Sequence, residues 1–181
     1  MKWFKKKEKK EHNYIPRMDG QDYIDSTRAY LDYLEEHLNN IAKAFTELTD
    51  ACDGKEYWAS NLFDWELFKR EVMEHDLSKF TKEEFVQYRD NFFPVSPEDN
   101  ENSDFSSAWE NHKICNPHHH ESAKGFMDIA HMLIDWMAMG YKFNDNPWDY
   151  YEKMKDSLDI SEDHRVYLLR LLNNLKEWRT L

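Results

Sequence analysis

Glycine is scarce in this chain, with four residues among 181, at positions 20, 54, 125 and 140. P-loop and Rossmann folds wrap phosphate with closely spaced glycines, so we exclude both classes of nucleotide-binding protein. The composition, 40% apolar and 33% charged, is that of a compact globular protein rather than a disordered one. A chain of this length fits a single domain.

Cysteine and long apolar runs are also scarce. Cys52 and Cys115 form neither a CxxC pair nor a disulfide framework, and we expect two ordinary buried or half-buried thiols in a reducing compartment. The most apolar stretch, residues 129–139, is interrupted by His131 and Asp135, and no apolar segment follows the N-terminal lysines. The sequence therefore predicts a soluble cytoplasmic protein without a membrane partner.

Basic side chains are few outside the first 17 residues. That segment has seven basic side chains against two acidic ones, whereas the remainder has 17 basic and 34 acidic residues. Because an acidic surface repels the phosphate backbone, we exclude a nucleic-acid polymer as a partner. We expect residues 1–20 to be a flexible basic tail and residues 21–181 to be the folded domain.

Apolar residues recur at helical spacing along most of the chain, and no strand pattern stands out. The clearest stripe covers residues 24–48 and predicts one long helix. Its members are Ile24, Thr27, Leu31, Leu34, Leu38, Ile41, Phe45 and Leu48. His37 lies three residues after Leu34 and four before Ile41, so we expect its imidazole to point toward the packed side.

Capping and breaking signals place the other helices. We expect them over residues 64–75, from Thr81, over 104–116, over 122–139, from Pro147 after the cap Asn146, and from Ser161. Thr81 and Glu84 form a predicted capping box, and Gly140 is expected to end the fifth helix. In the last helix Val166, Leu169, Leu172 and Leu175 are expected to point inward.

The segment 93–103 contains two prolines and several acidic or amide side chains. It is typical of an exposed loop that no helix crosses, and it is a candidate mobile lid. The predicted fold is all-α, a single domain of about six to eight helices.

Histidines and aspartates recur in an ordered set along the chain. The set consists of His37, His75, Asp76, His112, His118, His119, His120 and Asp135. Imidazole and carboxylate groups are ligands for zinc, iron, manganese, cobalt and nickel, and helices can aim them at one point from several directions. We therefore expect one or two divalent transition metal ions, although His37 taken alone is more often a packed core histidine.

The adjacency of His75 and Asp76 indicates a site, and Lys79 and His131 are residues near the set that need separate interpretation. Successive helical residues point about 100° apart, so His75 and Asp76 cannot both enter an apolar core from one helix, and a site at a helix end explains both. Lys79 follows Asp76 by three residues and can present an ammonium to an oxyanion, the alternative being a surface lysine. His131 and Asp135 share a helix face; we expect Asp135 to ligate and His131 to pack.

Four histidines surround a helix break between residues 109 and 121. The residue before a proline disfavours the helical region, so the helix stops there and side chains can converge on one point. Three consecutive histidines cannot all bind equally well. We favour His118 and His119 as ligands, with His120 partly solvated.

The order H…HD…H…HH…D resembles the HD superfamily of metal-dependent phosphohydrolases, and residues 75–79 look like its HDxxK signature. More closely, residues 24–175 are similar to a phage and bacterial family of unknown function. The motifs that carry this similarity are HDLSKF at residues 75–80 with Glu84, Phe85 and Tyr88; Ala108, Trp109 and His112 with the NPHH of residues 116–119; and the pair Asp135 and Trp136. Members of the family carry a glutamate where this chain has His131.

The resemblance implies an HD-like helical bundle that hydrolyses a small phosphate ester, such as a nucleotide, with a metal-activated hydroxide. In it Asp76 bridges two ions; His37, His75 and Asp135 complete one coordination sphere, and His112, His118 and His119 complete the other. Lys79 would hold a phosphate oxygen, with Tyr88 and Asn116 at the substrate. The implied location is the cytoplasm of a bacterium or phage-infected cell, and a homo-oligomer is left open.

Two other functions stay open from the sequence. One is an HD-type diiron oxygenase, which the resemblance also implies because some HD-type proteins use the same ligands to activate oxygen. The other is a non-catalytic nucleotide- or protein-binding module of phage origin, in which the ligands serve stability alone.

Overall fold

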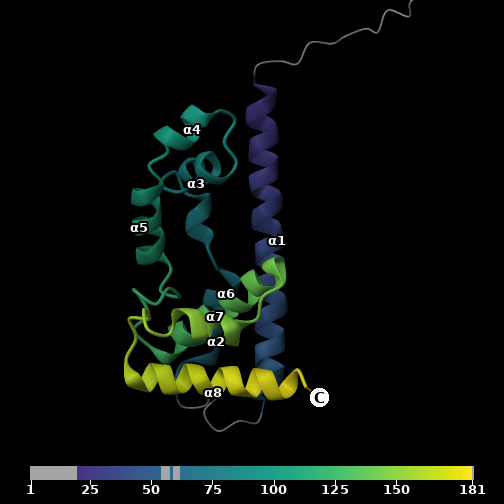
Figure 1. The fold of residues 1–181 in the computed structure, drawn as a ribbon, viewed down its shortest axis with the longest axis vertical. Coiled ribbons are helices and arrows are strands. Elements are labelled where there is room, and N and C mark those ends of the chain that lie inside the picture. Colours follow the sequence, from purple (N-terminus) through teal and green to yellow (C-terminus); the bar gives the residue numbers. More distant parts are fainter. Residues whose placement is uncertain (1–19, 54–57, 59–61, 181) are drawn as a thin grey trace, which may run out of the picture.

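One long helix forms the frame of the molecule. The computed structural model describes residues 20–53, 58 and 62–180, and α1 (Gln21–Cys52) follows most of the long axis (Figure 1). Its buried side chains alternate at steps of four and three, which keeps them on one face. They are Tyr30, Leu34, His37, Ile41, Ala44 and Leu48. The predicted inward direction of His37 is therefore confirmed.

Seven further α-helices and one 3-10 helix complete the described part of the chain. They are α2 (Trp65–Met73), the 3-10 helix η1 (Leu77–Phe80), α3 (Phe85–Phe92), α4 (Pro97–Asn102), α5 (Phe105–Cys115), α6 (Phe126–Phe143), α7 (Pro147–Met154) and α8 (Glu162–Trp178). No strand occurs among these residues, which confirms the all-α prediction.

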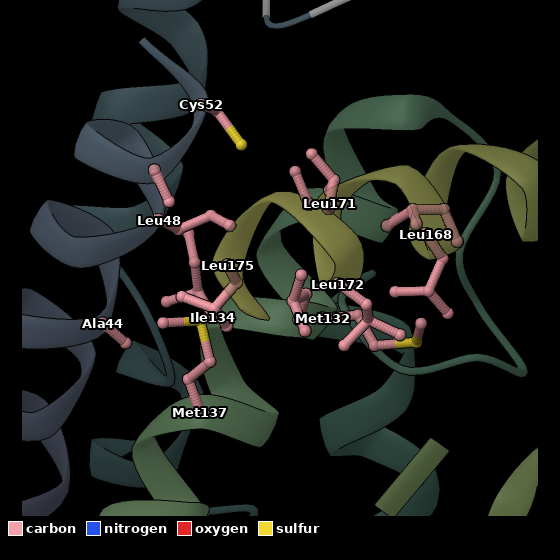
Figure 2. Close-up of a cluster of buried hydrophobic side chains, with 14 of the residues drawn as sticks. Ala44, Leu48, Cys52, Met132, Ile134, Met137, Leu168, Leu171, Leu172 and Leu175 are labelled. Carbon is pink, nitrogen blue, oxygen red and sulfur yellow. The ribbon is translucent and has the colours of Figure 1, made fainter. Parts of the chain in front are cut away.

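The main apolar core lies where α1, α6 and α8 cross. The three helices contact one another, and Figure 2 shows side chains from each of them gathered in a common cluster. They include Ala44 and Leu48 of α1, Met132, Ile134 and Met137 of α6, and Leu168, Leu171, Leu172 and Leu175 of α8. Full burial of one such leucine or isoleucine contributes about 1.5–3 kcal/mol to the stability of the fold, so the packing at this crossing stabilises the arrangement of α1, α6 and α8.

A second, smaller core lies further toward the N-terminal end of α1. Tyr30 and Leu34 pack there with Tyr88 of α3 and Ala108 of α5. Phe85 meets the Tyr30 ring edge-on at 5.2 Å between centroids, a favourable arrangement for two aromatic rings. The chain therefore has two apolar clusters along one helix, with the polar site between them.

The predicted apolar face of α1 is wrong near its start. Ile24 and Leu31 are 47% and 41% exposed, whereas Tyr30 is fully buried. The helix α3 contacts α1 on the face that carries Tyr30, so the aromatic ring takes the buried position instead of its apolar neighbour.

The last helix starts as predicted but faces the core with other residues. Ser161 caps it, its hydroxyl accepting from the backbone N–H of His164, and Leu172 and Leu175 are buried. Val166 and Leu169 are exposed, whereas the core receives Leu168 and Leu171. Leucines at adjacent positions allow two apolar faces, and periodicity does not choose between them.

Segment 93–103 contains a helix, contrary to the prediction. Pro97 is the first residue of α4 rather than a breaker, a position where its missing N–H costs nothing. The Asp99 carboxylate accepts from the backbone N–H groups of Val95 and Ser96 and holds the start of the helix.

The predicted capping box at Thr81 is also wrong. The Thr81 hydroxyl donates to the Ser78 carbonyl, and α3 begins only at Phe85. Glu84 does not reach back to Thr81, because its carboxylate is fully buried in the polar site.

The helix expected over residues 122–139 begins and ends later. α6 follows Gly125 and continues past Gly140, ending at Asn144 in the left-handed conformation at φ 53°. Gly140 instead allows the backbone of Asp145 to lie close to the helix, because a Cβ at position 140 would be 2.7 Å from the Asp145 carbonyl oxygen. The predicted start of α7 is confirmed, with Asn146 as cap and Pro147 at the first position.

Three remaining observations concern the expectations on solubility, the tail and the thiols. In the described part of the chain, no helix has the length and apolar character needed to cross a bilayer. Apart from Gly20, the expected tail of residues 1–20 lies outside the described residues. Cys52 is buried as expected, but Cys115 is exposed rather than half-buried.

Gly140→Ala tests the close approach at the end of α6. Alanine favours a helix interior by about 0.5–1 kcal/mol. Contact with a backbone carbonyl forces a shift that costs more, so we expect a net loss of about 1–2 kcal/mol in the free energy of unfolding. Urea denaturation measures it. The control is Gly20→Ala, where a Cβ meets no atom of the described residues within 4 Å; equal stability of the two variants would contradict the packing described.

Candidate metal centre

His37 enters the site from the middle of α1. It lies between Leu34, which belongs to the smaller core, and Ile41, which belongs to the main core. Only 4% of its surface is exposed. The junction of two apolar clusters thus contains an imidazole that needs polar partners.

His75 and Asp76 come from the turn that follows α2. The helix ends at Met73, and Asp76 has left-handed backbone angles, φ 57° and ψ 21°, before η1 begins. This conformation costs roughly 1–2 kcal/mol for most residues, less for aspartate, and it changes the direction of the chain. Both side chains are buried and face the same place, as the prediction of a site at a helix end requires.

One oxygen of Asp76 faces two histidines. Its Oδ2 lies 3.6 Å from His37 Nε2 and 3.4 Å from His75 Nε2. Asp135 Oδ1, from α6, is 3.4 Å and 3.7 Å from the same two nitrogens. The two ring nitrogens are 3.0 Å apart. Four candidate ligand atoms from α1, the α2–η1 turn and α6 therefore surround one point. We call the residues that carry them the first ligand group: His37, His75, Asp76 and Asp135.

The other oxygen of Asp76 faces a different set of histidines. Its Oδ1 lies 3.3 Å from His112 Nε2, at the inner face of α5, and 3.4 Å from His118 Nε2 in the following turn. Nitrogens of His112, His118 and His119 lie within 4.8 Å of one another. These three histidines with Asp76 form the second ligand group.

The separations fit ligands that share an ion. Two atoms each about 2.0–2.2 Å from one metal, at angles between octahedral and trigonal, lie roughly 3–3.7 Å apart. The contacts around Asp76 fall in this range. Among the described residues, the buried atoms Asp76 Oδ1, His118 Nε2 and His119 Nε2 also have no hydrogen-bond partner. Buried polar atoms without partners are costly, and a cation would satisfy all three.

Charge in the site suits a cation as well. Burial opposes ionisation of Asp76, but the neighbouring His75 and Lys79 hold the pKa of its carboxyl well below the usual range. For Asp135, the nearby His75, His118 and His37 outweigh burial and lower the pKa. Burial lowers the pKa of His119 to about 3, with help from His118, so this ring is neutral and has a free lone pair.

Lys79 points into the site and not into solvent. It is 8% exposed, and its Nζ donates to Asp76 Oδ2 at 2.6 Å. Burial opposes its charge, but Asp76 outweighs burial and raises the pKa of the ammonium. The alternative of a surface lysine is therefore wrong.

Glu84 is a site residue that the sequence reasoning missed. Its Oε2 accepts from His112 Nδ1 at 2.9 Å, and its Oε1 accepts from Asn111 Nδ2 at 2.7 Å. A histidine that donates from Nδ1 presents the lone pair of Nε2 to a metal, and a carboxylate partner raises its basicity. Glu84 was expected to take part in a helix cap, so its role beside His112 was not predicted. Its position in the EF pair near HDLSKF was a usable signal for that role.

His131 plays a similar part for the first ligand group. Its Nε2 lies 2.9 Å from His75 Nδ1, so it can accept from that nitrogen while His75 Nε2 faces Asp76. Burial, with His118 and His75 nearby, lowers the pKa of His131 well below its usual range, which keeps the ring neutral. The residue packs as expected, but it also orients a ligand.

The residues expected at the substrate separate into two groups. Lys79 and Tyr88 line a cavity of about 610 Å³ that opens over the site, and the Tyr88 hydroxyl has no hydrogen-bond partner in the part of the chain that the structure describes. Asn116 does not line it; its Nδ2 donates to Ser78 Oγ at 2.7 Å and to the His112 carbonyl at 2.8 Å. Asn116 therefore ties the end of α5 to η1.

The consecutive histidines differ in position. His118 is buried behind the cavity, whereas His119 and His120 line it. The His120 side chain is 24% exposed, and its Nδ1 accepts from the backbone N–H of Asp159. The structure therefore brings His118 and His119 to the site and leaves His120 at its edge.

Comparison with known families assigns the chain to one of them. The pattern of a family of unknown function, DUF5662, matches residues 26–174. The chain belongs to the DUF5662 family. This confirms the resemblance to a family of unknown function, and the match contains all seven expected ligands. Among curated proteins and among solved structures, nothing matches the chain. Membership of DUF5662 assigns no activity, so function is argued from the site.

Glu84→Gln tests the support of the second ligand group. Loss of the carboxylate charge lowers the basicity of His112, and we expect the affinity for one bound divalent ion to fall about 10–100-fold. Competition with a chelating dye measures it. The matched control is Glu110→Gln on the exposed face of α5, where the carboxylate pairs with Lys113 at 2.8 Å. Equal affinities for both variants would remove the role given to Glu84.

Proposed function

We propose that this DUF5662 protein is a metal-dependent phosphohydrolase that acts on a small phosphate ester, with a nucleotide as the candidate substrate. The observation that carries the proposal is the position of Asp76, whose two oxygens face two separate ligand groups. This arrangement supports two divalent transition metal ions bridged by one carboxylate. It also supports the resemblance to the HD superfamily, in which the same residues are expected in the same roles.

The metals would supply a nucleophilic water of lowered pKa and would neutralise charge on the phosphoryl oxygens. The chain itself positions the reacting groups. His37, His75 and Asp135 fix one side of the Asp76 carboxylate, and the second ligand group fixes the other. Because three of the candidate ligands lie on helices and the other four in the short turns that follow α2 and α5, the fold sets their geometry before substrate arrives.

Lys79 is the proposed phosphate-binding residue. Its ammonium lies at the cavity surface beside Asp76, where it can move from the carboxylate oxygen to a substrate oxygen a short distance away. Tyr88 offers a hydroxyl without a partner on the same wall. Both groups support recognition of a phosphoryl oxygen next to the metals.

The cavity suits a small molecule better than a polymer. A volume of about 610 Å³ lies within the range of sites for small ligands. The formal net charge of -12 opposes the approach of a nucleic-acid backbone. The proposed compartment is the cytoplasm, where free thiols such as Cys52 and Cys115 persist.

A diiron oxygenase is the second candidate, and the ligand chemistry is compatible with it. Imidazole and carboxylate ligands suit iron as well as manganese or zinc.

Elemental analysis of the purified protein, followed by a phosphate-release screen over nucleotides with several divalent metals, separates the hydrolase from the oxygenase. Phosphate release without oxygen supports the hydrolase, whereas two irons and an oxygen-dependent reaction support the oxygenase. Nucleotide binding without turnover supports a binding module.

Asp76→Ala tests the bridging carboxylate. Since it removes the one group shared by both ligand sets, we expect less than one metal ion per chain and no phosphate release. Circular dichroism should show unchanged helix content, because the two apolar cores remain. A variant that keeps two ions and its activity would contradict the proposal.

Lys79→Gln tests phosphate recognition. Loss of one positioned cation should lower kcat about 100-fold while metal content stays the same. Lys69→Gln is the control, since Lys69 pairs with Glu66 on the surface of α2 and does not line the cavity. An unchanged rate in Lys79→Gln would remove this residue from the mechanism.

A further inference from the structure

The cavity has a polar end and an aromatic remainder. His37, Asp76, His112 and Asp135 border it where the two ligand groups meet. Among the described residues, eight aromatic side chains line the cavity, including Tyr88, Phe92, Phe105, Trp109, Trp136 and Tyr150. The phosphohydrolase proposal explains the polar end and leaves most of these rings without a function.

One aromatic wall comes from α3 and α5. Tyr88 and Phe92 each meet Phe105 edge-on, with centroids 5.1 Å and 5.2 Å apart. Trp109 stacks on His112 at 5.6 Å and meets His119 edge-on at 5.0 Å. Rings braced against one another and against ligand histidines hold their orientation, so this wall is preorganised for a ligand.

A second part of the aromatic lining comes from α6 and α7. Trp136 follows Asp135 directly and meets Tyr150 edge-on at 4.8 Å. Met139 and Met154 complete the apolar lining beside them. Each tryptophan thus adjoins one ligand group, Trp136 the first and Trp109 the second.

Positive charge along the cavity is sparse, which disfavours a run of several phosphoryl groups. Among the described residues that line it, Lys79 is the one lysine or arginine, and it is already paired with Asp76. Glu121 also lines the cavity, as does Asp145, which pairs with Lys153 at 3.0 Å. A second or third phosphoryl group would meet carboxylates and rings there, whereas an apolar body would meet a matching surface.

Two rings at the cavity remain open to solvent. Phe92 is 56% exposed and Phe143 is 65% exposed, although both line the cavity. A ligand that covers large aromatic side chains beside a binding site binds more favourably, because it removes their apolar surface from water.

We propose that the substrate carries one phosphoryl group at Asp76 and Lys79 and a flat aromatic ring that packs against Trp109 and Trp136. This inference rests on the proposed function and narrows its substrate class. The two tryptophans are then specificity-determining residues that contact the body of the substrate and not its reacting atoms. A saturated apolar body is the competing substrate class, and it lacks the ring faces that aromatic stacking needs.

Two phosphonates of matched size test the ring. Benzylphosphonate and cyclohexylmethylphosphonate share a head group that hydrolysis does not cleave, and calorimetry without oxygen gives Kd for the metal-loaded full chain. Burial alone favours the more apolar cyclohexyl group, whereas aromatic packing favours the benzyl group by about 2–10-fold. We expect the benzyl compound to bind more tightly. Trp136→Leu and Trp109→Leu should each abolish that preference, and Trp136→Phe should retain it.

The control is Trp178→Leu, at the end of α8 and outside the cavity, which should leave both affinities unchanged. A wild-type preference for the cyclohexyl compound, equal affinities, or no binding of either compound would overturn the inference. So would a benzyl preference that survives both leucine variants. A benzyl preference that is lost in those variants, together with no phosphate release from benzyl phosphate, would support the aromatic site and reject the hydrolase.

Discussion

A single buried carboxylate determines the arrangement of the site. Asp76 is 3% exposed and has four imidazole nitrogens and one ammonium around its two oxygens. Removing an anion from water costs several kcal/mol unless charge and hydrogen bonds compensate. The left-handed turn after α2 brings the carboxylate to the junction of the two apolar cores, so helices from both parts of the molecule must supply its partners.

Two further side chains position the candidate ligands. Glu84 contacts His112, and His131 contacts His75. Because the ligands come from α1, the α2–η1 turn, α5, its following turn and α6, bound ions would tie both apolar cores together. Metal binding would then stabilise the folded chain, in addition to supplying chemistry.

The sequence predicted the helices and the converging residues better than the details of packing. Periodicity identified α1 and the place of His37, and the adjacency of His75 and Asp76 indicated a site at a helix end. It did not choose between adjacent apolar residues such as Leu168 and Leu169, since both fit a helical stripe. Glu84 was missed because a local capping pattern and a long-range contact with His112 use the same residue type, and only tertiary structure separates them.

We propose that Asp76 would hold two ions together, one with each histidine group. Anomalous diffraction from crystals grown with manganese would locate such ions. We expect two peaks roughly 3.5–4 Å apart on either side of the Asp76 carboxylate, the usual separation in two-metal sites. One should adjoin His37, His75 and Asp135, and the other His112, His118 and His119. A single peak, or peaks away from Asp76, would contradict the claim.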